Sequence, residues 1–231
     1  MWNRNPAHGR YRAPVLPDAR EGADRRALAE ARGHSRAGVI RIRLRVVVVG
    51  IPGVGKTTVV ESTASAWKNS RLVTFGTVML EEGLRLKWIR HRDQLRKMRV
   101  EEQTKLQRIA ARKISAMKES VLFVDTHLFI RTPEGFWPGL PFHVVTALKP
   151  THLVLIEADS EVVLSRRTRD PTRYRDRVNK EELESELLLA RSFLTTASSI
   201  SGAPMMMLRN EEGRVEETVQ RLIDVLREAR P

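Results

Sequence analysis

The segment from Gly50 to Thr58 constrains this chain more than any other, because it matches the pattern G-x-x-x-x-G-K-[ST] in a specific context. It follows the apolar run Ile42–Val49, which has the composition of a buried parallel strand, and it leads into residues 57–67, which have that of a helix. A strand, a glycine loop and a helix in this order are typical of the phosphate-binding loop. We therefore expect phosphates to be bound by Gly50, Ile51, Pro52, Gly53, Val54, Gly55, Lys56, Thr57 and Thr58.

The residue types in this loop suit a nucleoside triphosphate. The three glycines let the backbone approach the phosphate oxygens closely, with successive N–H groups directed inward. Lys56 adds a positive charge for the β- and γ-phosphate oxygens, and Thr57 offers a hydroxyl to Mg²⁺. The positive end of the following helix completes an anion-binding site. A glycine turn with a purely structural role is the less favoured alternative.

The composition excludes several classes of protein. The chain has 231 residues, enough for one α/β domain with small inserts but too few for two full domains. It has no cysteine, which excludes disulfides, thiolate zinc sites and a cysteine nucleophile. No apolar stretch reaches the length of a membrane span, and residues 1–38 lack the apolar centre of a signal peptide. We therefore expect a cytoplasmic protein.

The formal net charge of +13 suits nucleic acid, an acidic membrane or a small polyanionic substrate. Residues 1–38 contain eight arginines, four acidic residues and no apolar periodicity. This composition predicts a disordered basic extension, followed by a single domain over residues 39–231. Two interpretations of the extension stay open: translation that begins near Val39, which we favour, and an arm that binds nucleic acid.

Five apolar runs of strand length recur along the chain, with helix-length segments between them. The runs are Ile42–Val49, Leu72–Phe75, Val121–Val124, Leu153–Glu157 and Pro204–Leu208. Their alternation with helices predicts an α/β fold of three layers, in which helices cover both faces of a parallel sheet. Helices are expected at 57–69, 77–86, 92–98, 100–119, 141–148, 160–168, 180–200 and 214–230.

Asp125 follows the apolar run Val121–Val124 directly. The carboxyl ends of parallel strands meet at one edge of a sheet, so Asp125 is expected beside the phosphate loop. Its carboxylate there suits the coordination shell of Mg²⁺, the Walker B role. The alternative is an aspartate that caps the next turn. His127 lies close by, and we interpret it as a hydrogen-bonding residue rather than a metal ligand.

Six arginines lie between Arg166 and Arg177, a run of twelve residues interrupted by Pro171. Such a run commonly forms a solvated surface or a nucleic-acid patch. A phosphotransferase has another use for it, as a flexible lid that neutralises phosphate charge and excludes water. We favour the lid, because the run lies between a strand–helix unit and the last pair of helices.

Two further segments leave alternatives open. Residues 74–79 and the basic cluster 90–98 follow the second expected strand, where they could receive a second phosphate-bearing substrate. Residues 132–141 form an expected loop with turn residues and two aromatics, which packs either over a base or over the sheet edge.

Together these segments resemble the archaeal adenylate kinases, a family of nucleoside monophosphate kinases. The resemblance spans Ile42 to about Arg230 and rests on six motifs in the same order. The motifs are GIPGVGKTT at 50–58, FGTVM at 75–79, RDQLRKM at 92–98, DTH at 125–127, TPEGFWPGLP at 132–141 and TRYRD at 172–176.

This resemblance implies a P-loop NTPase fold with a five-stranded parallel sheet, a monophosphate-binding insert at about 76–100 and a small arginine-rich lid at about 167–180. It implies reversible, Mg²⁺-dependent phosphoryl transfer from ATP to AMP, which gives two ADP, and a homotrimer. The metal would lie at Thr57 and Asp125, and the monophosphate at Thr77 and Arg92. The implied catalytic residues are Lys56, Arg92, Arg167, Arg173 and Arg175.

Two other functions were weighed against this one. A GTPase switch is disfavoured, because Asp125 is followed by Thr-His-Leu, without the glycine of many γ-phosphate sensors, and no guanine-specificity motif follows a strand. An RNA-associated P-loop ATPase of ribosome assembly stays open as the alternative, supported by the arginine-rich start and the basic remainder of the chain.

Overall fold

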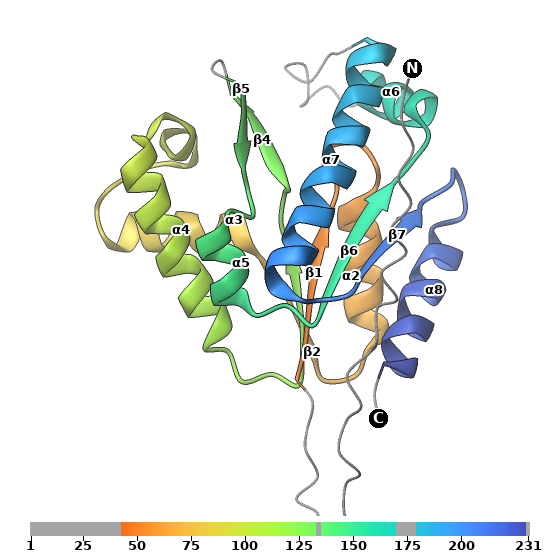
Figure 1. Cartoon of the computed structure of the whole chain (residues 1–231), viewed down its shortest axis with the longest axis horizontal. Coiled ribbons are helices and arrows are strands. Elements are labelled where there is room, and N and C mark those ends of the chain that lie inside the picture. The colour runs from red at the N-terminus through yellow and green to blue at the C-terminus, as the bar shows by residue number, and fades with distance from the viewer. Residues whose placement is uncertain (1–42, 133–134, 170–178, 230–231) are drawn as a thin grey trace, which may run out of the picture. The chain divides into compact units, whose positions relative to one another are not determined.

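A five-stranded parallel sheet lies at the centre of the domain. The structure, a computed structural model, describes residues 43–132, 135–169 and 179–229. The strands of this sheet are β1 (Leu44–Val49), β2 (Ser70–Thr74), β3 (Val121–Asp125), β6 (His152–Glu157) and β7 (Met205–Arg209). They lie in the order β2-β3-β1-β6-β7, and every neighbouring pair is parallel (Figure 1). The predicted sheet is confirmed.

Helices cover both faces of this sheet, which confirms the three-layer α/β fold. They are α2 (Lys56–Ala66), α3 (Phe75–Arg85), the 3-10 helix η1 (Arg92–Lys97), α4 (Val100–Ser115), α5 (Phe142–Leu148), α6 (Ser160–Arg169), α7 (Lys180–Ser201) and α8 (Val215–Glu228). On one face α2 packs against α8. On the other face, α7 contacts β6 and β7 and packs against α5. Helix α5 in turn packs against α4, and α4 packs against α3 (Figure 1).

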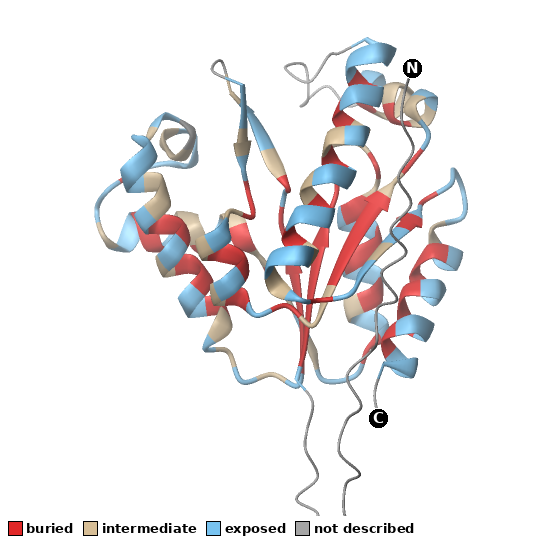
Figure 2. Cartoon of the chain, in the orientation of Figure 1, coloured by how far each residue is buried: buried red, intermediate tan, exposed pale blue. Residues whose placement is uncertain are grey.

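The core explains why the central strands are continuously apolar. All residues of β1 and β3 are buried, because neighbouring strands flank them and helices cover both of their faces (Figure 2). The register pairs Val48 with Asp125 and Thr74 with Asp125. The end of β3 therefore lies between the ends of β1 and β2, next to the loop that leaves β1.

Two local predictions were wrong. Phe75, expected at the end of a strand, is the first residue of α3, where it is buried. The helix expected at 92–98 is present, as the 3-10 helix η1. The expected loop 132–141 contributes to an antiparallel hairpin of β4 (Phe129–Thr132) and β5 (Gly135–Pro138). Aromatic packing supports this hairpin, since Phe129 lies 4.9 Å from Phe136 and 5.6 Å from Phe193 of α7, centroid to centroid.

Part of the predicted organisation falls outside the described residues. This applies to the basic extension 1–38, and to residues 170–178 with Arg173 and Arg175. Of the predicted lid, residues 167–169 form the end of α6 and residues 179–180 begin the next helix. None of the helices in the described part of the chain combines the length and hydrophobicity that crossing a bilayer requires.

Candidate active site

The phosphate loop connects β1 to α2 through two glycines in the left-handed region. Gly53 has a φ of 93° and Gly55 a φ of 84°, values that side-chain-bearing residues rarely adopt. Gly55 is the N-cap of α2, so Lys56 is the first residue of the helix. This geometry places the positive end of the helix at the loop, as the sequence pattern predicts.

Three successive carbonyl groups of the loop accept hydrogen bonds from side chains. The Pro52 carbonyl accepts from Nε of Arg167 at 2.9 Å, and the Gly53 carbonyl accepts from Arg166 at 3.5 Å. The Val54 carbonyl accepts from Nδ2 of Asn210 at 2.8 Å. In a trans peptide the N–H points opposite to the C=O. These contacts therefore turn the N–H groups of the residues that follow each carbonyl, from Gly53 to Gly55, away from the three side chains.

Asn210 follows β7 directly and is buried. Its backbone N–H donates to the carbonyl of Glu157 at 2.7 Å, which fixes it at the carboxyl edge of the sheet. A Cβ atom on Gly55 would collide with its side-chain nitrogen. Among the described residues, Asn210 Oδ1 is the one buried side-chain polar atom without a hydrogen-bond partner. This side of the loop thus has an acceptor that a ligand or water could satisfy.

Lys56 and Asp125 form a buried ion pair, in which Lys56 Nζ donates to Asp125 Oδ1. The lysine comes from the start of α2 and the aspartate from the end of β3, so the parallel register brings them together as the sequence predicts. Thr57, the next residue of α2, is exposed and lines the same cavity as Lys56.

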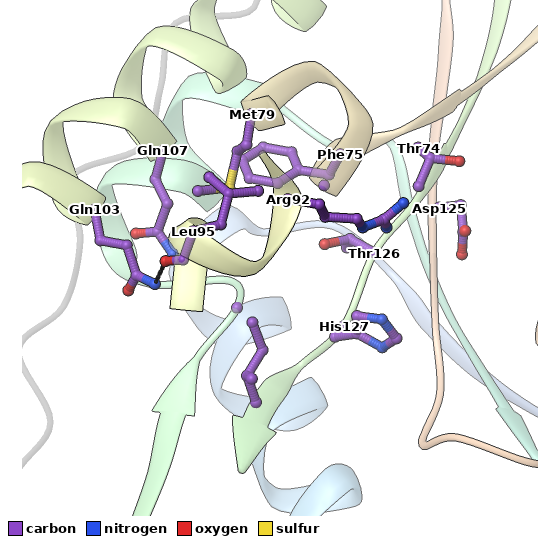
Figure 3. A pocket seen from close by; sticks show the side chains of 13 residues that line it. Thr74, Phe75, Met79, Arg92, Leu95, Gln103, Gln107, Asp125, Thr126 and His127 are labelled. Carbon is purple, nitrogen blue, oxygen red and sulfur yellow. Dashed lines mark hydrogen bonds between the residues drawn. The ribbon is translucent and has the colours of Figure 1, made fainter. Parts of the chain in front are cut away.

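Two cavities lie along this edge of the sheet. The first, of about 250 Å³, is bounded by the phosphate loop, Arg166 and Arg167. The second, of about 160 Å³, is lined by Thr74, Phe75, Gly76, Met79, Arg92, Leu95, Gln103, Gln107, Asp125, Thr126, His127, Ile130 and Gly139 (Figure 3). His127 lines both cavities. We name them the donor cavity and the acceptor cavity, and they meet at His127 and the Lys56–Asp125 pair.

The acceptor cavity combines an apolar wall with a polar end. Figure 3 shows Arg92 reaching from η1 toward Thr126 and the end of β3. Two amides, Gln103 and Gln107, lie one turn apart on α4 at the opposite side. Gln103 Nε2 donates to the carbonyl of Leu95 at 2.8 Å. A charged end and an apolar region with amides are the features that a phosphate and a base require.

His143 orients one of these amides. Its Nε2 lies 3.2 Å from Oε1 of Gln107. Burial, and secondarily the charge of Arg108, lowers the pKa of His143, so its ring is neutral at pH 7. A neutral ring that donates from Nε2 fits this contact, because the other end of the Gln107 amide faces the carbonyl of Pro138 at 3.5 Å.

The oxygen ligands at the boundary of the two cavities fit Mg²⁺. Asp125 supplies a carboxylate and Thr57 a hydroxyl, and both belong to the edge at which the two cavities meet. Mg²⁺ commonly takes one or two protein oxygens and completes its shell with water and substrate phosphates. Among the described residues there is no group of three or more His, Cys, Asp or Glu that could hold a metal without a substrate.

The structure brings most of the predicted site residues together. Arg167 and the loop residues other than Gly50 and Val54 line the donor cavity, and Arg92 and Asp125 line the acceptor cavity. Thr77 is exposed on α3 and is not among the lining residues, although its neighbour Gly76 is. Arg167, expected in a mobile lid, is 5% exposed and turned toward the loop.

Sequence reasoning missed several residues that shape the site. They are Gln103, Gln107, Glu186 and Asn210. A usable signal existed for Asn210, a polar residue placed after the last apolar strand in the same way as Asp125. The two glutamines, four residues apart on a predicted helix, could have been recognised as sharing one face.

The fold and the loop define a P-loop α/β protein. The family model described as "AAA domain" matches residues 49–184. Shikimate kinase from Bacteroides thetaiotaomicron shares the fold, with a TM-score of 0.55, 14% identity, and coverage of 80% of this chain and 98% of that one. Shikimate kinase from Acinetobacter baumannii, solved with shikimate, gives a TM-score of 0.50 at 15% identity, covering 82% and 96%.

Sequence relatives narrow this class. The adenylate kinase of Methanocaldococcus jannaschii is 40% identical over 187 residues, which cover 79% of this chain and 97% of that protein. The adenylate kinase of Pyrococcus horikoshii is 39% identical over 184 residues, covering 78% and 94%. That of Thermoplasma volcanium is 36% identical, covering 80% and 100%. The chain belongs to the family of archaeal adenylate kinases, as the sequence motifs predicted.

Proposed function

We propose that this protein is an adenylate kinase, which transfers the terminal phosphoryl group of ATP to AMP and gives two ADP. One observation supports this most strongly: two cavities meet at His127 and the Lys56–Asp125 pair. One cavity has a phosphate loop and the other has an arginine at its polar end. Two nucleotides bound end to end would bring their phosphates together at this boundary.

On the donor side, backbone N–H groups from Gly53 to Gly55 and the start of α2 would hold the phosphates of ATP. Lys56 would contact the β- and γ-phosphate oxygens. Thr57 and Asp125 would hold Mg²⁺, which neutralises phosphate charge when bound. Arg166 and Arg167 line the same cavity and donate to the carbonyls of Gly53 and Pro52.

On the acceptor side, Arg92 would bind the phosphate of AMP through its guanidinium group, which suits phosphate oxygens geometrically. The base would lie against Phe75 and Met79, within reach of Gln103 and Gln107. An amide offers both a donor and an acceptor, which matches the hydrogen-bonding edge of adenine. Thr77 stays a prediction for this region.

The transfer itself needs no general base, because the attacking phosphate oxygen is already anionic. The chain would contribute alignment of the two phosphates and stabilisation of charge on the transferring group. His127 borders the path between the cavities and helps to exclude water from it. Arg173 and Arg175 stay predictions as further cationic groups of the lid.

The purified protein tests this function directly. It is incubated with Mg·ATP and with AMP, GMP, CMP or UMP in turn, and the products are resolved by nucleotide. We expect ADP formation that depends strictly on AMP. ATP hydrolysis at a rate independent of AMP would overturn the proposal, and so would phosphoryl transfer to another monophosphate that is faster than transfer to AMP.

Arg92 and Arg90 provide a matched pair for the acceptor site. Both are exposed arginines of the same segment, and Arg92 alone lines the acceptor cavity. Arg92→Gln is expected to raise the KM for AMP about tenfold or more, the effect of roughly 1.4 kcal/mol of lost binding. The KM for ATP should stay near its wild-type value, and Arg90→Gln should change neither. Equal effects of the two variants on AMP would contradict the assignment of Arg92.

The other predictions from sequence stand differently. The RNA-associated ATPase drew on the arginine-rich residues 1–38, which lie outside the described residues, and nothing in the described part of the chain favours it. The homotrimer and the cytoplasmic location stay predictions. Static light scattering of the purified protein measures the first.

A further inference from the structure

A buried carboxylate on α7 lies between two arginines that come from opposite sides of the site. Glu186 is 6% exposed. Its Oε1 lies 3.0 Å from Nη2 of Arg131, and its Oε2 lies 3.1 Å from Nη2 of Arg167. Each carboxylate oxygen therefore serves one arginine, and the group links the two side chains.

On one side of Glu186, Arg167 connects the carboxylate to the phosphate loop. Arg167 belongs to α6, and its Nε donates to the Pro52 carbonyl at 2.9 Å. Its side chain also packs on the loop, because a Cβ on Gly53 would lie 3.2 Å from its Cγ. Since the Pro52 carbonyl and the Gly53 N–H share one peptide plane, the position of Arg167 sets the direction of that N–H.

On the other side of Glu186, Arg131 connects the carboxylate to the hairpin of β4 and β5, which Figure 1 shows beside α7. Arg131 lies over the ring of Phe136 at 5.5 Å, so it is held against the second strand of the hairpin. The preceding residue, Ile130, lines the acceptor cavity. A ligand in that cavity thus contacts the same strand that carries Arg131.

The pair of Arg167 and Glu186 is buried, whereas Arg131 is half-exposed, and the buried pair needs an explanation other than stability. Desolvation of buried ion pairs offsets most of their attraction, and hydrophobic residues of similar size often stabilise a fold as well or better. What the arrangement does provide is a continuous link, because each carboxylate oxygen of Glu186 pairs with a different arginine.

We propose that Glu186 is a positioning residue that couples the acceptor cavity to the donor loop. AMP held against the hairpin fixes Arg131, Arg131 fixes the carboxylate of Glu186, and the carboxylate fixes Arg167 against the Pro52 carbonyl. The donor loop is then ordered before ATP arrives. This inference rests on the proposed function, since it requires that the two cavities bind AMP and ATP.

Binding measurements test the coupling without turnover. The affinity of the full chain for the Mg²⁺ complex of a β,γ-imido analogue of ATP is measured by calorimetry, with and without saturating AMP. In the wild type we expect AMP to tighten the analogue about fivefold or more, and the analogue to tighten AMP by the same factor, as reciprocity requires. In Glu186→Gln this factor should fall below about twofold.

Two variants guard the interpretation. Arg131→Met removes the ion pair between Arg131 and Glu186 at a half-exposed position and leaves Glu186 paired with Arg167. This variant should also abolish most of the coupling. It keeps the test valid if Glu186→Gln does not fold. Glu182→Gln is the matched control, because Glu182 lies one turn earlier on α7, is half-exposed and is 3.6 Å from Arg131. It should retain the wild-type factor.

The outcomes separate the two proposals. If the wild type binds neither AMP nor the analogue, the proposed function fails. If it binds both but without coupling, or if Glu186→Gln and Arg131→Met retain the wild-type coupling factor, the role of Glu186 is overturned while the proposed function stands. Loss of coupling in Glu182→Gln to the same extent would also overturn it, because a general change of charge on α7 would then suffice.

Discussion

Replacing Lys56 by Met should abolish phosphoryl transfer and, as a separate effect, destabilise the fold. The side chain lies at the boundary of the two cavities, where the proposed reaction would develop charge on the transferring group. Loss of one such preorganised cation commonly lowers kcat by about 10³ or more. We expect at least this loss in the coupled assay with Mg·ATP and AMP.

The loss of stability follows because the substitution leaves the carboxylate of Asp125 without its ion-pair partner. The side chains of Lys56 and Asp125 are 8% and 11% exposed. Removing one member of a buried pair costs about 3–5 kcal/mol, because the other charge is left without compensation. Both side chains border a cavity that water can enter, so we expect a smaller cost of about 2–3 kcal/mol. For a domain of this size the melting temperature should fall by roughly 5–10 °C.

A second substitution separates the two effects. In Lys56→Met/Asp125→Asn the uncompensated charge is gone, so the melting temperature should recover by at least half of the loss, while transfer stays absent. Thermal unfolding by circular dichroism measures the first quantity and the coupled assay the second. Wild-type turnover in Lys56→Met would refute the donor assignment. A double variant less stable than Lys56→Met would refute the uncompensated carboxylate as the cause.

Two further predictions concern the acceptor cavity and helix α3. In Gly139→Ala the new methyl would meet the backbone carbonyl of His127, so we expect about 1–3 kcal/mol of destabilisation and at least tenfold lower kcat/KM. In the control Gly76→Ala the new methyl has nothing within 4 Å, so the stability should stay within about 0.5 kcal/mol of the wild type. Equal melting temperatures of the two variants would contradict this prediction. The pKa of Glu82 is lowered, first by the hydrogen bond from Lys113 and then by Arg85. Stability from this group is therefore present above its unfolded pKa of about 4.3 and lost as pH falls through the lower folded value. Both partners are substantially exposed, so urea titration of Glu82→Gln should show a loss of only about 1 kcal/mol at pH 7 that disappears as the pH falls through the folded pKa of Glu82. A loss unchanged by pH would refute the ionic explanation.

Local sequence patterns predicted the sheet and the donor loop because each depends on neighbouring residues. Strands buried on both faces must be continuously apolar, which marks β1 and β3 without knowledge of their partners. The carboxyl ends of parallel strands share one edge, so Asp125 could be placed beside Lys56 although 69 residues separate them.

The hairpin β4–β5 could not be predicted in this way. Each of its strands has only four residues, and the second ends in Pro138, a residue typical of loops. Its stability comes from packing of Phe129 on Phe193 of α7, a contact between residues 64 positions apart, which no local pattern reveals. The hairpin wall of the acceptor cavity was therefore missed, and with it the position of Ile130.

The arginine run was interpreted as a lid because six positive charges in twelve residues suggest one common role. The structure gives its first two members a different one. Arg166 pairs with Glu212 at 2.6 Å and Arg167 with Glu186 at 3.1 Å, so protein carboxylates compensate both charges. Both guanidinium groups also bind carbonyls of the donor loop. In the proposed site their contribution to phosphate binding would be indirect, because they hold the peptide planes that carry the loop N–H groups.

Charge counting alone could not distinguish these roles, because the distinction depends on which carboxylates and carbonyls lie within reach after folding. The glycines at 53 and 55 reveal that the loop backbone is sharply turned. The side chains that keep it turned come from α6 and from the residue after β7, more than 100 positions away. A phosphate loop is thus only partly specified by its own motif, and the remainder lies in the residues that bind its outward carbonyls.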